Sequence, residues 1–351
     1  MPRIARFALI PAMALAMVLP AGNVLAEQQA AYTVAETGRG YERLQDAVNA
    51  IGSGTGTIRF ASFAFADCAV QSEGDILYKA AVPGEAVLDG VACEGKAALV
   101  LGGRRARIDG LVFANMKVPD GNGAGIRLQH GDLEVSQSWF RDSQQGILTV
   151  NGETGSITID KSTFTRLGTC EFSGGCAHSI YVGDYGSVTV TRSRFEAGRG
   201  GHYLKSRAAR ITVLDSSFDD SAGRETNYMI DLPNGATGRI AGNWFVQGKS
   251  KENHTALITV APEGKEHSSN GLVIEGNDAR LAPGAGRNTI FVVDWWGPAG
   301  HRHQYGRRRA EALRTAVVCS TTNAPSDRAW SRGSGHCADW RGAGAPRARQ
   351  R

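Results

Sequence analysis

One short pattern recurs along most of the 351-residue chain and constrains its fold more than any other feature. The full pattern has two alternating aliphatic residues, two further residues, Ser or Asn, any residue, and an anchor that is usually Phe, and the segment 108–113 begins it without the Ser or Asn. The anchors recur every 23 to 34 residues. The copies are IDGLVF (108–113), LEVSQSWF (133–140), ITIDKSTF (157–164), VTVTRSRF (188–195), ITVLDSSF (211–218), IAGNWF (240–245) and LVIEGNDA (272–279).

This pattern predicts a solenoid of stacked strands. A short strand followed by a turn cannot bury its apolar face alone, so it has to stack on copies of itself. A helical repeat is a poor alternative, because the segments are rich in β-branched residues and interrupted by glycine. We expect the Ser and Asn residues to form a hydrogen-bonded ladder and the Phe residues to stack in the core. Loops of different length should leave each coil on one side.

The opening segments suggest how the solenoid begins. YERLQDAVNAI (41–51) predicts a short amphipathic helix that caps the first coil, and the strand-like segments 56–65 and 86–103 follow it. With the repeat, these segments resemble the right-handed parallel β-helix of the pectin-lyase-like superfamily over residues 30–296. We therefore expect an all-β, single-domain right-handed parallel β-helix over residues 27–296, with an N-terminal capping helix.

Both ends of the chain differ from the repeat. Residues 1–26 contain two Arg, an apolar run and a final Ala, which predicts a signal peptide and a secreted or periplasmic protein. A membrane anchor is the alternative, but the apolar run is shorter than the ~20 residues that span a bilayer, so we expect no stable membrane insertion. Residues 297–351 are rich in Arg and lack Lys, which indicates a disordered extension or an out-of-frame reading; a capping tail is the alternative.

Six cysteines fit an oxidising compartment. Cys170 and Cys176 enclose the short CEFSGGC loop, and Cys68 could pair with Cys93 across neighbouring segments. Cys319 and Cys337 could also pair. A thiolate metal site is the alternative, but the chain contains no CxxC pair.

The net charge argues against nucleic acid as a partner. Residues 301–351 contain 11 Arg and 3 acids, and residues 1–26 contain two Arg and no acid. The formal charge of +5 therefore leaves −5 for residues 27–300. A body of this charge is not a basic nucleic-acid surface. We expect a monomer, and the family resemblance implies that its partner is an acidic polysaccharide.

A second strand after each anchor carries the candidate site. The residues of RGGHYLKSRA (199–208) should alternate, with Tyr203, Lys205 and Arg207 on one face. Aligning Ile180 with Leu204 and Ile230 then stacks outward positions of neighbouring coils about 4.8 Å apart. The predicted columns are Tyr181, Lys205 and Asp231; then Ser179, Tyr203 and Met229; and, at the strand edge, His178, His202 and Tyr228.

The family resemblance implies a reaction for such a cleft. Members of this superfamily commonly cleave acidic polysaccharides by β-elimination, which needs a base, a group that neutralises the uronate carboxylate, and an acid. We expect Lys205 to be the base, in the neutral form that burial and the Arg207 cation favour, and Arg207 to bind the carboxylate through its planar fork. Tyr181 or His178 could instead be the base or the acid. His202 completes the catalytic candidates, and Asp231, Tyr203, Arg127 and Tyr228 are the predicted substrate-binding residues.

Two related chemistries fit the sequence less well. Ca²⁺ needs about six oxygen ligands, several of them carboxylates. Only Asp231 lies in the predicted column, with Asp184, Asp219, Asp220 and Glu225 near it, so we expect no obligatory cofactor and leave Ca²⁺ as an alternative. Hydrolysis by paired carboxylates would need two or three clustered acids on successive strands, which the sequence lacks.

Other functions and plainer interpretations remain open. The same cleft could belong to a non-catalytic glycan-binding or envelope polysaccharide assembly protein, or to an epimerase that returns the proton to the opposite face. Lys205 and Arg207 could be ordinary surface residues, and Asn234 with Gly235 indicates a turn. Trp295 and Trp296 could stack on sugars or close the last coil, and Glu263 is expected to be an ordinary loop residue.

Overall fold

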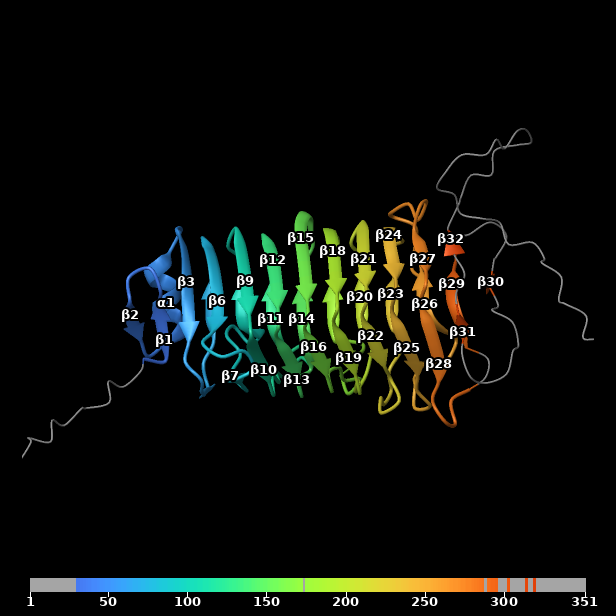
Figure 1. Ribbon diagram of the computed structural model, residues 1–351, viewed down its shortest axis with the longest axis horizontal. Coiled ribbons are helices and arrows are strands. Elements are labelled where there is room, and N and C mark those ends of the chain that lie inside the picture. Colours follow the sequence, from blue (N-terminus) through green and yellow to red (C-terminus); the bar gives the residue numbers. More distant parts are fainter. Residues whose placement is uncertain are drawn as a thin grey trace, which may run out of the picture.

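The computed structural model describes residues 30–172, 174–286 and 289–295, and the backbone of three short strands at 302–303, 313–314 and 318–319. The predicted signal peptide, Trp296, Cys337 and most of the Arg-rich tail lie outside these residues. The described chain forms one long solenoid whose strands run side by side from end to end (Figure 1). The predicted all-β, single-domain fold is confirmed as a parallel β-solenoid.

Sheet A is the longest of the three sheets, with 12 strands among the described residues. In spatial order it contains β2 (Arg39–Tyr41), β1 (Tyr32–Val34), β3 (Thr55–Phe60), β6 (Asp75–Ala80), β9 (Arg105–Asp109), β12 (Asp132–Ser136), β15 (Gly152–Asp160), β18 (Tyr185–Thr191), β21 (Arg210–Leu214), β24 (Thr237–Ala241), β27 (Val273–Glu275) and β32 (Val318–Cys319).

Sheet B contains, in chain order, β4 (Ala64–Phe65), β7 (Ala86–Asp89), β10 (Leu111–Ala114), β13 (Trp139–Arg141), β16 (Thr163–Thr165), β19 (Arg194–Glu196), β22 (Ser217–Asp219), β25 (Trp244–Gln247), β28 (Asp278–Leu281) and β31 (Leu313–Arg314). Sheet C contains β5 (Ala69–Gln71), β8 (Ala97–Leu101), β11 (Ala124–Leu128), β14 (Gln145–Thr149), β17 (Ile180–Val182), β20 (Leu204–Ser206), β23 (Ile230–Leu232), β26 (Ala256–Val260), β29 (Ile290–Asp294) and β30 (Arg302–His303).

Each coil passes through sheets B, C and A in turn, and strands of neighbouring coils pair in parallel. Among the described strands, antiparallel pairs occur only at the two ends of the solenoid. At the start, β1 pairs with β2 and β3. At the other end, β30, β31 and β32 from the tail each pair with the last coil strand of one sheet.

The repeated Ser and Asn residues line the corner between sheets A and B. The residue before each of them has a positive φ, for example 47° at Lys161 and 48° at Arg192, a region that L-residues visit rarely. The Ser hydroxyls also bond the backbone at this corner, as Ser162 Oγ donates to Asp160 O and Ser193 Oγ donates to Thr191 O. Each backbone N–H donates to the side-chain oxygen of the next coil, in the pairs Ser138 to Ser162 (3.3 Å), Ser162 to Ser193 (3.2 Å), Ser193 to Ser216 (3.1 Å), Ser216 to Asn243 (2.9 Å) and Asn243 to Asn277 (2.9 Å). The predicted ladder is confirmed.

The anchor residues of the repeat stack inside the solenoid. Their rings are fully buried and nearly parallel, with centroid distances of 4.7 Å for Phe113–Phe140, 4.9 Å for Phe140–Phe164, 4.8 Å for Phe164–Phe195, 4.7 Å for Phe195–Phe218 and 5.0 Å for Phe218–Phe245. The last anchor is Ala279, and Phe245 meets the edge of Phe291 instead. The predicted aromatic stack is therefore confirmed, and it forms the centre of the core.

The predicted capping helix is present as α1 (Leu44–Ile51) at the N-terminal end of the solenoid (Figure 1). It buries Leu44, Ala47 and Val48 against the core, so its apolar face closes the open end of the first coil. The Leu44 backbone N–H donates to Asp67 Oδ2 at 2.8 Å, which satisfies one of the free amides of the first turn.

Both disulfides that can be assessed match the predicted pairs. Cys68 bonds to Cys93, and Cys170 bonds to Cys176. The proposed Cys319–Cys337 pair lies outside the residues whose side chains are described. Structural disulfides persist in oxidising compartments, so these two bonds are consistent with a protein that works outside the cytoplasm.

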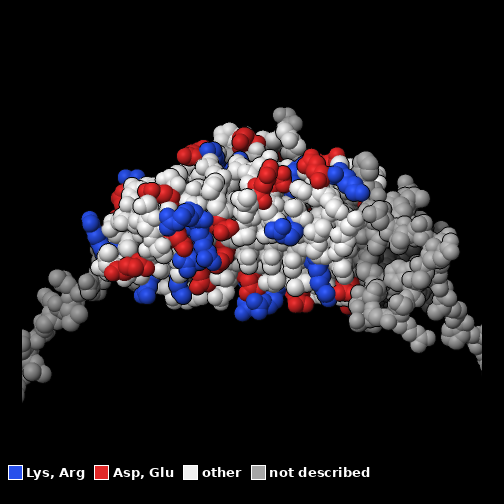
Figure 2. All heavy atoms as spheres, turned by 90° about the horizontal axis from the view of Figure 1, so that it is seen from above, with Lys and Arg blue, Asp and Glu red and all other residues white. Residues whose placement is uncertain are grey.

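Charges of both signs are interspersed on the face seen from above in Figure 2, where Lys and Arg lie next to Asp and Glu and uncharged surface separates the groups. Ion pairs join residues of different coils, such as Arg107 with Asp75 and Arg166 with Asp142. This face is therefore not a continuous basic surface of the kind that binds nucleic acid.

We predict that Phe164→Ala lowers the free energy of unfolding by about 3–5 kcal/mol, because it removes one ring from the middle of the stack and leaves a cavity. Thr163→Ala, on the outward position of the same strand, is the control and should change stability by about 0.5 kcal/mol or less. Urea denaturation of both variants measures the difference. Equal effects of the two substitutions would show that the stack does not carry the core.

Candidate functional site

The candidate site lies on the outer face of sheet C, where the predicted register is confirmed. Tyr181 pairs with Lys205, and Lys205 pairs with Asp231, as neighbours on β17, β20 and β23. The residues on the inward side of these strands are fully buried and, apart from Ser206, apolar. This burial fixes which side chains point outward. The column continues on β26 with Thr259.

Two cations of this face share one carboxylate. Lys205 Nζ lies 2.7 Å from Glu263 Oε1, and Arg207 Nη2 donates to Glu263 Oε2. Burial alone would raise the pKa of Glu263, but the hydrogen bonds from Lys205 and Arg207 lower it below its usual range. Glu263 is therefore a carboxylate held in a two-cation clamp, although 46% of its side chain is exposed.

The phenol of Tyr181 belongs to the same cluster. Arg207 Nε donates to Tyr181 Oη at 3.0 Å, and Arg207 Nη1 donates to Asn234 Oδ1 at 2.5 Å. Lys205 Nζ lies 5.6 Å from the centre of the Tyr181 ring, within the range of a cation–π contact. The guanidinium is thus fixed in orientation, and a phenolic oxygen lies beside the clamped carboxylate.

Asp231 is the buried acid of the cluster and lies between Lys205 and His202. Its side chain is 3% exposed, and Thr259 Oγ1 donates to its Oδ1 at 2.7 Å. Its Oδ2 lies 3.5 Å from Lys205 Nζ and 3.4 Å from His202 Nε2. Burial raises the pKa of Asp231, and the nearby Lys205 and the Thr259 hydrogen bond offset this only in part.

The predicted edge column of His178, His202 and Tyr228 forms a stack of rings next to the cluster. The ring centroids are 5.0 Å apart for His178 and His202, and 5.5 Å apart for His202 and Tyr228. The His202 backbone N–H donates to His178 Nδ1 at 3.0 Å. Burial, with a contribution from the Lys205 cation, lowers the pKa of His202 to about 3, and burial also lowers that of His178. Both imidazoles are therefore neutral and only 8% exposed.

The prediction that Tyr203 shares the outward face of Lys205 is wrong. Tyr203 is 1% exposed and lies in the core, where its hydroxyl donates to Asp220 Oδ1 at 2.7 Å. Strand β20 begins only at Leu204, because the chain before it turns through Gly201 at φ 59° and alternation does not extend back to Tyr203. The other members of its predicted column, Ser179 and Met229, are also buried.

Arg127 lies in the outward column but does not touch the cluster. It pairs with Leu148, and Leu148 pairs with Tyr181, so one apolar residue separates Arg127 from the phenol. Burial lowers the pKa of Arg127, with Asp120 opposing the effect, and its buried Nε has no hydrogen-bond partner within the described chain.

Sequence reasoning missed the part of the site that comes from residues 261–271, the loop after β26. The loop is anchored on the 233–235 turn, where Glu263 N donates to Pro233 O (3.1 Å) and His267 N to Asn234 O (2.9 Å). From there it reaches back over earlier coils, and His267 Nε2 lies 3.1 Å from Asp184 Oδ1. The signal that could have found it is the interval of 34 residues between anchors 245 and 279, the longest in the repeat.

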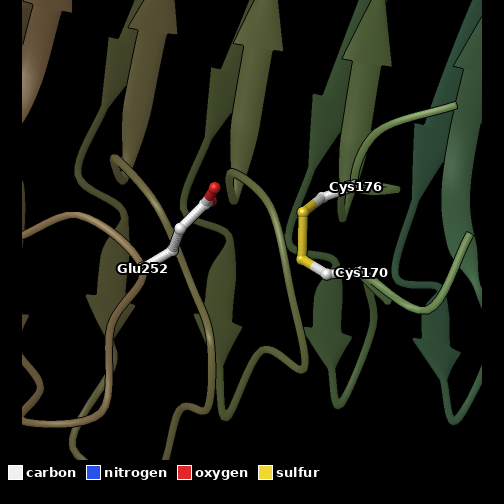
Figure 3. Close-up of side chains that lie close together, drawn as sticks. All are labelled: Cys170, Cys176 and Glu252. Atoms are coloured by element: carbon white, nitrogen blue, oxygen red, sulfur yellow. A yellow bond between two sulfur atoms is a disulfide. The ribbon is translucent and has the colours of Figure 1, made fainter. Parts of the chain in front are cut away.

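The structure does not gather the acids considered for Ca²⁺. Asp220 is buried with Lys251 at 2.9 Å, Asp184 is next to His267, and Asp231 is next to Lys205. One group of three potential ligands does occur in the described residues, formed by Cys170, Cys176 and Glu252 (Figure 3). Its two sulfur atoms are bonded to each other as a disulfide, so neither is a thiolate that could bind a metal.

A hollow of about 700 Å³ lies elsewhere, at the N-terminal end, lined by residues around β1, β3 and β6. None of the clustered residues lines it. Its lining includes Glu36, Arg59 and Lys79. The contacts among Tyr181, Lys205, Arg207 and Glu263, rather than cavity size, mark the candidate site.

Known proteins give little guidance. No protein-family model matches the chain, the pectin-lyase-like superfamily included, and no curated protein matches it. Among solved structures the chain is similar to ORF18 of Geobacillus virus E2, with a TM-score of 0.43 and 11% sequence identity. The match covers 72% of this chain and 56% of that one, and no activity is carried over from it.

No helix within the described residues has the length and apolar character needed to cross a membrane.

We predict that acid destabilises the protein partly through His202. Its pKa is about 3 in the folded state and about 6.5 in an unfolded chain, so the unfolded state binds a proton that the folded state excludes. Stability from this group is present above the unfolded value and is lost as the pH falls toward the folded value. His202→Gln should therefore reduce the loss of unfolding free energy between about pH 7 and about pH 4.5 by about 2 kcal/mol.

Urea denaturation of wild type and variant at both pH values measures this effect. His130→Gln replaces an exposed histidine and is the control. An unchanged pH dependence in His202→Gln would mean that His202 takes up a proton in the folded protein as readily as in the unfolded chain.

Proposed function

We propose that the protein binds an acidic polysaccharide along the outer face of sheet C and cleaves it by β-elimination. The observation that supports this most is that Lys205 and Arg207 together hold one carboxylate, that of Glu263, next to the Tyr181 phenol. A uronate carboxylate in the same position would meet two cations and a group able to transfer a proton. The parallel β-solenoid fold fits a polysaccharide-active protein, because its sheets offer a long face to an extended chain.

In this proposal, Lys205 and Arg207 neutralise the sugar carboxylate. The hydrogen on the carbon next to a carboxylate becomes more acidic when the negative charge that develops on the carboxylate oxygens is stabilised. Arg207 suits this role because it is fixed by Tyr181 and Asn234 and presents its remaining N–H groups in a planar fork. Lys205, held between Asp231 and Glu263, supplies the second positive charge.

Tyr181 is the group that we propose for proton transfer. A base removes the proton α to the carboxylate, the C–H electron pair forms a carbon–carbon double bond, the bond to the glycosidic oxygen breaks, and that oxygen takes up a proton. Tyr181 is half-buried, whereas His178 and His202 are buried. We therefore give the histidines a structural role in this proposal. The alternative is that Lys205 is the base, and the experiment below distinguishes the two.

We also propose that the protein works outside the cytoplasm, as a secreted or periplasmic protein. The predicted signal peptide and the two disulfides support this location.

We predict that the purified protein forms unsaturated sugar products, seen by their ultraviolet absorbance, from a member of a panel of acidic bacterial, plant and algal polysaccharides. Tyr181→Phe should lower kcat by about 10²-fold or more, because it removes the proton-transferring hydroxyl. It should weaken binding only slightly, because Arg207 loses its bond to Tyr181 but keeps the one to Asn234. Lys205→Ala should weaken binding as well, because it removes a carboxylate ligand. Assays with Ca²⁺ and with EDTA test the cofactor alternative.

Lys249→Ala, on an exposed residue away from the cluster, is the control and should retain full activity. Loss of kcat in Lys205→Ala with binding intact would instead make Lys205 the base. Binding without any unsaturated product would contradict cleavage and favour a glycan-binding or polysaccharide assembly protein.

A further inference from the structure

Glu263 occupies the position that a ligand carboxylate would take in the proposed function. Its two carboxylate oxygens meet Lys205 Nζ and Arg207 Nη2, one each. Each oxygen of Glu263 therefore accepts a charge-assisted hydrogen bond from a different cation. The chain therefore fills its own carboxylate-binding position with a side chain that comes from the 261–271 loop.

The second carboxylate at Lys205 is different in kind. Asp231 belongs to the sheet, its side chain is 3% exposed, and Thr259 fixes its orientation. Glu263 lies on a loop, and its side chain is 46% exposed. The cations Lys205 and Arg207 are only 12% and 23% exposed, so Glu263 is the partner that reaches solvent. Because Glu263 can regain hydration there and lies on a loop, it can leave the clamp while Asp231 stays in the sheet.

The clamp can hold either Glu263 or a ligand carboxylate, but electrostatic repulsion prevents it from holding both. With Glu263 in place, the positive charges of Lys205 and Arg207 are balanced by Glu263 and Asp231. A second carboxylate brought to the same cations would face the Glu263 charge at close range, and like charges this close repel strongly.

We propose that Glu263 is an internal competitor for the carboxylated ligand, and that binding of a sugar carboxylate to Lys205 and Arg207 requires Glu263 to leave. This inference rests on the proposed function, since it concerns the same cations. It narrows the ligand to a chain whose acidic group is a planar carboxylate like that of Glu263. It also makes the 261–271 loop the segment that moves when the ligand binds.

The proposal has a measurable consequence for affinity. A site that is open in only a fraction of the molecules binds with an affinity reduced by that fraction. Glu263→Gln removes the charge and keeps the size of the side chain, so the clamp should be open in most molecules. We predict that this variant binds uronate oligomers about tenfold more tightly than wild type.

Isothermal titration calorimetry with short oligomers of galacturonate, mannuronate and glucuronate, and with a neutral oligosaccharide of equal length, tests this. Glu266→Gln is the matched control, because it removes the same charge from the same loop and contacts Asn234 rather than the cations. The proposal is supported if Glu263→Gln binds uronate oligomers more tightly than wild type and Glu266→Gln does not. Equal tightening in both variants would indicate only a general charge effect and overturn it.

Weaker binding in Glu263→Gln would also overturn the proposal, because Glu263 would then be a ligand-binding residue rather than a competitor. So would the absence of uronate binding to both proteins, since the clamp would then not be a carboxylate site. Cleavage is read separately from the unsaturated product. Tighter uronate binding without product would leave the competitor role intact and reject only the lyase.

Discussion

The hydrogen-bonded ladder of Ser and Asn side chains is the interaction on which the rest of the structure depends. At the turns from sheet A to sheet B between Ser138 and Asn277 the backbone takes a positive φ, and the ladder side chain bonds the backbone of the neighbouring coil. This links each coil to the next at one fixed position. Because a slip of one residue would reverse inside and outside on every strand, the ladder and the Phe stack beside it set the register of the whole solenoid.

The site follows from that register. Parallel coils place equivalent side chains about 4.8 Å apart, so a group placed on one coil meets the group at the same position on the next. Like rings then stack, as His178 and His202 do, and unlike charges pair, as Lys205 and Asp231 do. The buried Asp231 is tolerated because a cation and the Thr259 hydroxyl lie within reach, in keeping with the rule that buried charges are paired.

Sequence reasoning succeeded where the repeat applies and failed where it stops. The alignment of Tyr181 with Lys205 and Asp231 was predictable, because all three follow the apolar alternation of β17, β20 and β23. Tyr203 was misplaced because the chain turns at Gly201 and the alternation begins only at Leu204, the first residue of β20. Glu263 was taken for an ordinary loop residue, since nothing in its local sequence indicates that it bonds to residues 58 and 56 positions earlier.

The sequence by itself determined the solenoid, its ladder and core stack, both disulfide pairs and the row of polar residues on sheet C. These rest on a repeated pattern, on the short loop between Cys170 and Cys176 or, for Cys68 and Cys93, on a separation of 25 residues, which is close to the length of one coil. Only the tertiary structure decided which polar residues form the cluster, because the 261–271 loop folds back over earlier coils without following the repeat. The contacts of Glu263 with Lys205 and Arg207 depend on the path of that loop, and a loop path is set by contacts between segments that are distant in the sequence.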